Sequence, residues 1–169
     1  QGVGMVAQSM GMDVHTYDPY LPPKVARNQS TRLHKDVDDL FKSCTHISVH
    51  CNLSEETHHL VNYERMKLMP GKSRLGLNCG NHIVNCARGG IVHEDEIRQS
   101  LIAGDLTTAA LDVFEIEPAT DNDLLEIDRF TSTPHIGAAT KEAQSRIGDE
   151  IISIINSFES DEIPDSALN

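Results

Sequence analysis

HIVNCARGGIVHEDEIRQSLIAGDLTTAALDVF, residues 82–114, is the stretch that decides the fold. It opens with a short apolar run at residues 82–86, continues as a helical pattern at residues 94–103, and closes with a nearly continuous apolar run at residues 109–114. Gly104 is placed to end the helix, because glycine tolerates the left-handed backbone that often follows one. A continuous apolar run is typical of a strand covered on both faces. We therefore predict a strand–helix–strand unit whose two strands are parallel.

The same alternation continues on both sides of this unit. Further strands are expected at residues 12–17, 45–50 and 130–133, and further helices at residues 3–10, 37–41, 62–69 and 141–158. Asp36, Asn62 and Thr140 are placed to cap the last three helices. The pattern predicts an α/β fold with a doubly wound, Rossmann-like parallel sheet. Such a sheet opens with a strand and a glycine loop, so we expect an incomplete version that lacks both.

One motif near the start fits a nucleotide-binding fingerprint but lacks its context. Gly2-Val-Gly4-Met-Val-Ala7 matches G-x-G-x-x-A, which must follow a strand and open a helix. Only Gln1 precedes it, and Gly11 follows after three more residues. We interpret these small residues as part of the first helix.

The composition argues against two classes of partner. The 169 residues carry a formal net charge of −12, whereas nucleic-acid-binding proteins present a basic surface. No apolar run reaches the roughly 18 residues that a membrane span needs, and the start lacks the features of a signal peptide. We expect a cytoplasmic protein with neither nucleic acid nor membrane as a partner.

The cysteines and histidines do not indicate a metal site. The chain has four cysteines, none in a CxxC pair, and reduced thiols are the simpler expectation. Cys79, His82 and Cys86 could be ligands, but no fourth ligand is apparent. His58 and His59 lie in a polar loop where no convergent carboxylate or thiolate is seen. No metal is therefore expected.

Three ionisable residues each follow a predicted strand. Arg88 follows residues 82–86, Glu117 follows residues 109–114, and His135 follows the strand that ends near residue 133. Ligands of open α/β sheets bind at the carboxyl ends of the strands. An arginine there can hold a carboxylate with a bidentate fork, and an acid beside a histidine fixes its tautomer for proton transfer. Each could also be an ordinary polar loop residue, but together they indicate a catalytic edge.

Four segments carry a resemblance to a known family. They are NCARGG at 85–90, ALDVFEIEP at 110–118, PHIGAATKEAQ at 134–144 and GMDVHTYDPY at 11–20. Their order and spacing resemble the signatures of the D-2-hydroxyacid dehydrogenases, and residues 140–148 are most similar to the 3-phosphoglycerate dehydrogenases. The resemblance implies an NAD-binding domain, truncated at its N-terminus, at residues 1–158. It also implies a tail at residues 159–169 that leads back to an absent substrate domain.

The resemblance also implies an activity and a set of site residues. The reaction would be NAD-dependent oxidation of a D-2-hydroxy acid, with 3-phosphoglycerate to 3-phosphohydroxypyruvate, a step of serine biosynthesis, as the nearest case. Arg88 would bind the carboxylate of the 2-hydroxy or 2-oxo acid, His135 would take the hydroxyl proton, and Glu117 would hold His135 in a usable protonation state. The residues expected to line the cofactor are Asp18, Cys51, Cys86, Ala87, Arg88, Asp112, His135, Ile136, Gly137 and Ala138. Asp18 would accept from the ribose hydroxyls and Asp112 from the nicotinamide carboxamide. A homo-oligomer is expected at full length.

Three departures from the family pattern keep alternatives open. The glycine loop is missing, residues 50–53 (HCNL) replace the family's His-x-Pro-Leu near Cys51, and residues 72–81 look like an insertion. The alternative to an active enzyme is a catalytically inactive fragment, or a nucleotide-binding or co-regulator module.

Overall fold

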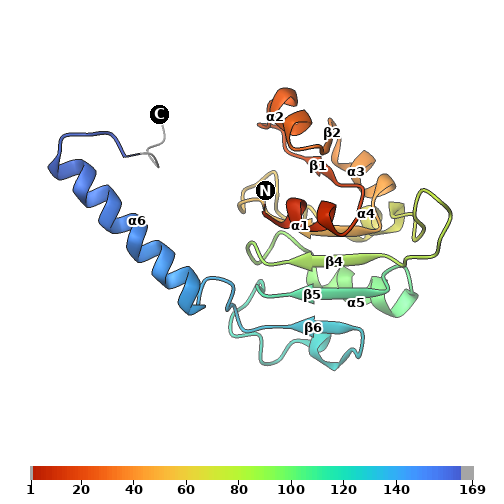
Figure 1. Ribbon diagram of the computed structural model, residues 1–169. Coiled ribbons are helices and arrows are strands. Elements are labelled where there is room, and N and C mark those ends of the chain that lie inside the picture. The colour runs from red at the N-terminus through yellow and green to blue at the C-terminus, as the bar shows by residue number, and fades with distance from the viewer. Residues whose placement is uncertain (1, 165–169) are drawn as a thin grey trace.

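The structure is a computed structural model of the chain and describes residues 2–164 (Figure 1). Helices and short strands alternate along the chain, as the sequence pattern predicts. In order they are α1 (Gly2–Ser9), β1 (His15–Tyr17), α2 (Pro23–Asn28), β2 (Arg32–His34), α3 (Val37–Ser43), β3 (His46–Val49), α4 (Tyr63–Leu68), β4 (His82–Asn85), α5 (Glu94–Ala103), β5 (Thr108–Leu111), the 3-10 helix η1 (Asp123–Glu126), β6 (Phe130–Ser132) and α6 (Lys141–Glu159).

The strands form two parallel sheets. Strands β3, β4, β5 and β6 lie side by side in that order, and β1 pairs with β2. The predicted α/β class and the parallel pairing are confirmed. The strands nevertheless form two sheets, because no strand among residues 2–164 is hydrogen-bonded to both β1 and β3.

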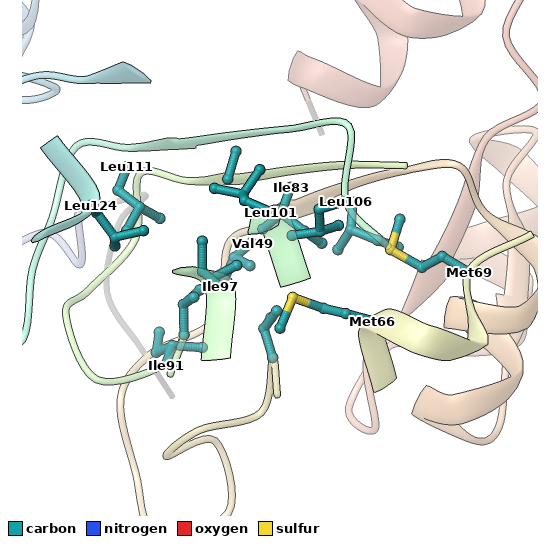
Figure 2. Packing of buried hydrophobic residues seen from close by; sticks show 14 of the residues in the cluster. Val49, Met66, Met69, Ile83, Ile91, Ile97, Leu101, Leu106, Leu111 and Leu124 are labelled. Atoms are coloured by element: carbon teal, nitrogen blue, oxygen red, sulfur yellow. The ribbon is translucent and has the colours of Figure 1, made fainter. Parts of the chain in front are cut away.

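The core lies between the four-stranded sheet and helices α3, α4 and α5. Strand residues such as Val49, Ile83 and Leu111 pack in one cluster with Ile97 and Leu101 of α5 (Figure 2). Each of these side chains is at least nine-tenths buried, and burial of such a side chain contributes about 1.5–3 kcal/mol. This packing fixes the carboxyl ends of β4, β5 and β6 relative to one another.

The opposite face of this sheet is much less covered. In β5, Ala109 and Leu111 are buried, whereas Thr108 is exposed and Ala110 only half-buried. Val84 of β4 is 38% exposed. The expectation that residues 109–114 are covered on both faces was therefore wrong for the strand itself. The reason is that the buried side chains of α3, α4 and α5 all pack in the one cluster that contains Ala109 and Leu111.

The helix boundaries follow local chemistry. The side chains of Asp36, Asn62 and Thr140 each accept a backbone N–H at the start of α3, α4 and α6, so the three predicted caps are confirmed. Gly104 ends α5 with a left-handed φ of 85°. Helix α2 was not predicted, although a proline at its first position is well suited to start a helix.

The first and last helices of the described chain, α1 and α6, contain no buried residue. Residues 2–7 lie inside α1, so their interpretation as helix rather than as a strand–turn–helix loop is confirmed. Helix α6 extends away from both sheets (Figure 1), and residues 165–169 of the predicted tail lie outside the described residues. No helix of residues 2–164 is both long enough and apolar enough to cross a membrane.

The suspected insertion at residues 72–81 is an exposed loop with a fixed base. Lys72 and Asn78 form an antiparallel bridge, and the side chain of Asn81 closes the loop. Asn81 Oδ1 accepts from the Gly71 amide at 2.7 Å, and its Nδ2 donates to the Asp105 carbonyl at 2.9 Å. The loop is therefore anchored at the amino end of β4, opposite the edge where Arg88 lies.

Candidate active site

Three parallel strands bring the loops of Arg88, Glu117 and His135 to one edge of the sheet. The residues follow β4, β5 and β6, which are paired neighbours. The first two loops also touch, because a Cβ on Gly89 would lie only 1.8 Å from the Phe114 carbonyl oxygen. Glycine at this position lets the backbone after β4 pack directly against the backbone after β5.

His135 and Glu117 form a directly bonded pair. His135 Nδ1 lies 2.8 Å from Glu117 Oε2, and Glu117 Oε1 accepts from the Phe114 amide at 3.0 Å. The hydrogen bond from His135, followed by that from Phe114, lowers the pKa of Glu117, so its carboxylate is ionised at neutral pH. No hydrogen bond to His135 Nε2 is found within residues 2–164, and the side chain is 47% exposed. The geometry therefore leaves Nε2 free to exchange a proton with a bound molecule.

Asp112 holds the loop that carries His135. Its Oδ1 accepts from the Thr133 hydroxyl and from the Ile136 amide at 2.8 Å, and its Oδ2 accepts from the Gly137 amide at 2.9 Å. Burial raises the pKa of this carboxyl, but these hydrogen bonds outweigh it and the net pKa is lowered. The side chain is only 4% exposed. The sequence did not predict this positioning contact, and a direct contact of Asp112 with the nicotinamide stays a prediction.

Asn85 fixes the loop that carries Arg88. Its buried side chain accepts from the Ala87 amide and donates to the Arg88 carbonyl, both at 2.9 Å. The exposed Arg88 side chain donates only to the Ala87 carbonyl, and no ion pair involves it in the part of the chain that the structure describes. Its guanidinium keeps free donors for an anion. Sequence reasoning missed Asn85, although a polar residue that ends an apolar run was the available signal.

The predicted cofactor residues fall into two groups. Cys86 and Asp112 line a pocket of about 70 Å³ with residues 131–133, and the amides of Ile136 and Gly137 donate to Asp112. Ala87 and Ala138 adjoin these residues in the chain. Cys51 follows β3 and is half-buried, and burial raises the pKa of both the Cys51 and the Cys86 thiol. Asp18 belongs to the other sheet, where it is exposed at the end of β1 and accepts from the Tyr20 amide.

The comparison with known families gives a clear match. Residues 1–137 match the family model described as D-isomer specific 2-hydroxyacid dehydrogenase, NAD binding domain. D-3-phosphoglycerate dehydrogenase of Methanocaldococcus jannaschii is 37% identical over 163 residues, which are 96% of this chain and 30% of that protein. Hydroxypyruvate reductase of Thermotoga maritima is 39% identical over 155 residues, 90% of this chain and 47% of that protein. The chain thus spans less than half of the length of these relatives, 30% of the first and 47% of the second.

Solved structures agree with the sequence match. D-lactate dehydrogenase from Aquifex aeolicus, solved with NAD and lactic acid, superposes with a TM-score of 0.75 at 29% identity, covering 95% of this chain and 50% of that chain. D-mandelate dehydrogenase from Rhodotorula graminis gives a TM-score of 0.76 at 27% identity, covering 92% of this chain and 43% of that chain. The predicted cofactor, NAD, is the one that the family's domain binds. With residues 1–137 matched, this chain belongs to the NAD-binding domains of the D-isomer-specific 2-hydroxyacid dehydrogenases.

Proposed function

We propose that the chain is the cofactor-binding part of an NAD-dependent enzyme that oxidises 3-phosphoglycerate to 3-phosphohydroxypyruvate. The observation that carries the proposal is the 2.8 Å bond between His135 Nδ1 and Glu117, which leaves Nε2 free at the strand edge. The substrate is suggested by the similarity to the D-3-phosphoglycerate dehydrogenase of M. jannaschii.

The three ionisable residues have distinct roles in this proposal. His135 Nε2 takes the proton of the substrate's 2-hydroxyl group and returns it in the reverse reaction. Glu117 stays anionic because its pKa is lowered, so it stabilises the imidazolium that forms. Arg88 holds the substrate carboxylate with guanidinium donors that no acid of residues 2–164 occupies. NAD, when bound, supplies the acceptor for the hydride that leaves C2.

The residues present fit two parts of NAD. Asp18 places an exposed carboxylate at the end of a strand, as an adenosine ribose requires. The carboxylate of Asp112 accepts one hydrogen bond at Oδ2 and has capacity for a second, as the nicotinamide amide requires. Cys51, Cys86, Ala87 and residues 135–138 complete the proposed contacts.

The pathway, the cellular compartment and the oligomeric state are part of the same proposal. We place the reaction in serine biosynthesis, in the cytoplasm, with the full-length protein as a homo-oligomer. The net charge of −12 supports a small-molecule partner over nucleic acid.

Steady-state kinetics of the chain, expressed with the coding sequence that flanks it, test the function. The protein should reduce NAD with 3-phosphoglycerate, and His135→Ala should lower kcat by about 10²–10⁴-fold, the usual contribution of general acid–base catalysis. Arg88→Lys should mainly raise KM, because lysine cannot make the bidentate contact.

His46→Ala is the matched control, since His46 is exposed on β3 and lies outside the proposed site. Unchanged turnover in His135→Ala would refute the role of His135. NAD binding without oxidation of any D-2-hydroxy acid would favour the non-catalytic nucleotide-binding module.

A further inference from the structure

Two histidines and a carboxylate converge on the surface beside the start of α5. His59 Nε2 lies 3.1 Å from Glu115 Oε1, and the rings of His59 and His93 stack with their centroids 4.2 Å apart. One nitrogen from each ring and one Glu115 oxygen all lie within 4.8 Å of one another. In a tetrahedral zinc site with bonds of about 2.0–2.1 Å, neighbouring ligand atoms are about 3.3 Å apart. Modest rotation of these partly exposed side chains therefore closes the set around one ion.

The backbone beneath the three residues is already fixed. The His59 amide donates to the Gly90 carbonyl at 2.8 Å, and the His93 amide donates to the Val61 carbonyl at 3.0 Å. Between these bonds, Val61 and Val92 form a parallel bridge. The Glu115 amide donates to Glu94 Oε1. Because the ligand-bearing segments are tied together, binding an ion requires side-chain movement only.

His93 gives a second, independent sign of a ligand. Its Nδ1 atom is buried and has no hydrogen-bond partner among the residues that the structure describes. Its Nε2 faces Glu96 Oε1 at 3.6 Å. A buried nitrogen without a partner calls for a bound ion or water. The Glu96 carboxylate lies just beyond hydrogen-bond distance of Nε2, on the side where a metal-binding histidine usually makes its outer contact.

The other histidine pairs lack this combination. His46 and His82 also stack, at 4.3 Å, but they form no ion pair with a carboxylate within residues 2–164. His15 lies between His34 and Asp13 but uses Nδ1 toward one and Nε2 toward the other, so a single ring atom cannot join both. The cluster at His59 is the candidate that offers one atom from each of three ligands.

We propose that His59, His93 and Glu115 bind one divalent transition-metal ion of the Zn²⁺ type, with water completing the coordination. Imidazole and carboxylate ligands suit zinc, and three protein ligands with one open position are a common zinc arrangement. The net charge of −12 favours cation binding. No metal was expected from the sequence because no carboxylate converged on His59, but Glu115, 56 residues further along the chain, provides one. The proposal is independent of the proposed dehydrogenase activity.

Titration of the 169-residue chain with ZnCl₂ by calorimetry tests the site. The chain should bind one Zn²⁺, and His59→Asn and Glu115→Gln should each weaken binding at least tenfold. Asparagine keeps the left-handed backbone that His59 adopts, with φ of 50°, and glutamine keeps the shape of Glu115. Both variants are therefore expected to fold, which circular dichroism checks.

The controls separate this site from other zinc ligands. His46→Ala should leave the affinity unchanged, and Mg²⁺ should not compete, because it prefers oxygen ligands in octahedral geometry. Binding should also survive alkylation of the four cysteines. Equal affinity in His59→Asn and the unaltered chain, or loss of binding on alkylation, would overturn the proposal.

Discussion

Helices α5 and α6 are both amphipathic, yet only one of them is packed. Helix α5, with ten residues, buries Ile97 and Leu101 completely against the four-stranded sheet. Helix α6 has nineteen residues and a continuous apolar face, but none of its side chains is buried by residues 2–164. Its exposed apolar residues are Ile147, Ile151, Ile152, Ile154, Ile155 and Phe158. Amphipathic periodicity thus identifies the apolar side of a helix but not what covers it.

The largest expected difference between the two helices is the cost of removing an apolar side chain. Leu101→Ala should lower the free energy of unfolding by about 2–5 kcal/mol, because it opens a cavity in the packed core. Ile151→Ala, on a side chain that is 51% exposed, should change it by less than about 0.5 kcal/mol. Urea denaturation compares the two, and equal losses would mean that α6 is packed in solution.

The next largest difference is the effect on stability of replacing glycine by alanine. The replacement should destabilise the loop after β4 and stabilise α6. Gly89→Ala should destabilise the protein by about 1–3 kcal/mol, because its Cβ would overlap the Phe114 carbonyl. A Cβ on Gly148 in α6 would meet no atom of residues 2–164 within 4 Å. Gly148→Ala should therefore stabilise α6 by about 0.5–1 kcal/mol. Thermal unfolding followed by circular dichroism measures both, and a stabilised Gly89→Ala variant would contradict the close approach.

The pH dependence of stability should also differ between the packed sheet edge and α6. The pKa of Asp112 is lowered in the folded state, so its stabilising effect is present above the unfolded pKa of about 4 and is lost as pH falls through the folded pKa. Asp112→Asn should cost about 1–2 kcal/mol at pH 7 and flatten the acid limb of the stability curve. Asp149→Asn, on exposed α6, is the control and should change neither. An unflattened curve for Asp112→Asn would show that its hydrogen bonds contribute little.

The smallest expected difference between the packed region and α6 is the effect of removing a helix cap. Asn62→Ala should lower global stability by about 1 kcal/mol, because α4 is part of the packed layer. Thr140→Ala removes an equivalent bond to the Ala143 amide but should only reduce the helicity of α6. Urea midpoints and far-ultraviolet circular dichroism distinguish these outcomes, and a shifted midpoint in Thr140→Ala would mean that α6 unfolds together with the core.

The sequence predicted the packed region better than the strand ends. The core strands were predictable because their apolar runs are flanked by turns and caps. β5 ends at Leu111 rather than at residue 114, because Asp112 turns its side chain to the loop after β6. β2 was not predicted, since Arg32–His34 holds a single apolar residue and shows no periodicity.

The candidate catalytic residues could be chosen from the sequence, but most of the contacts that position them could not. The positions of Arg88, Glu117 and His135 followed from strand ends and motifs, and the structure bonds His135 to Glu117. The role of Gly89 depends on which loops touch, which no local pattern records. The bonds of Asn85 lie within its own loop, so its signal was local and was missed. The contact of Glu115 with His59 likewise depends on the tertiary fold, because 56 residues separate them.

The backbone of His135 adopts a φ of 54°, in the left-handed region that residues other than glycine seldom adopt, although histidine, asparagine and aspartate do so more often than the rest. Holding histidine there costs on the order of 1–3 kcal/mol, which the Asp112 hydrogen bonds and the Glu117 pair must offset. Glycine at position 135 would relax this strain while removing the imidazole. The same substitution that abolishes proton transfer is therefore expected to relieve the backbone while losing the bond to Glu117, so the strained conformation is tied to the presence of the imidazole.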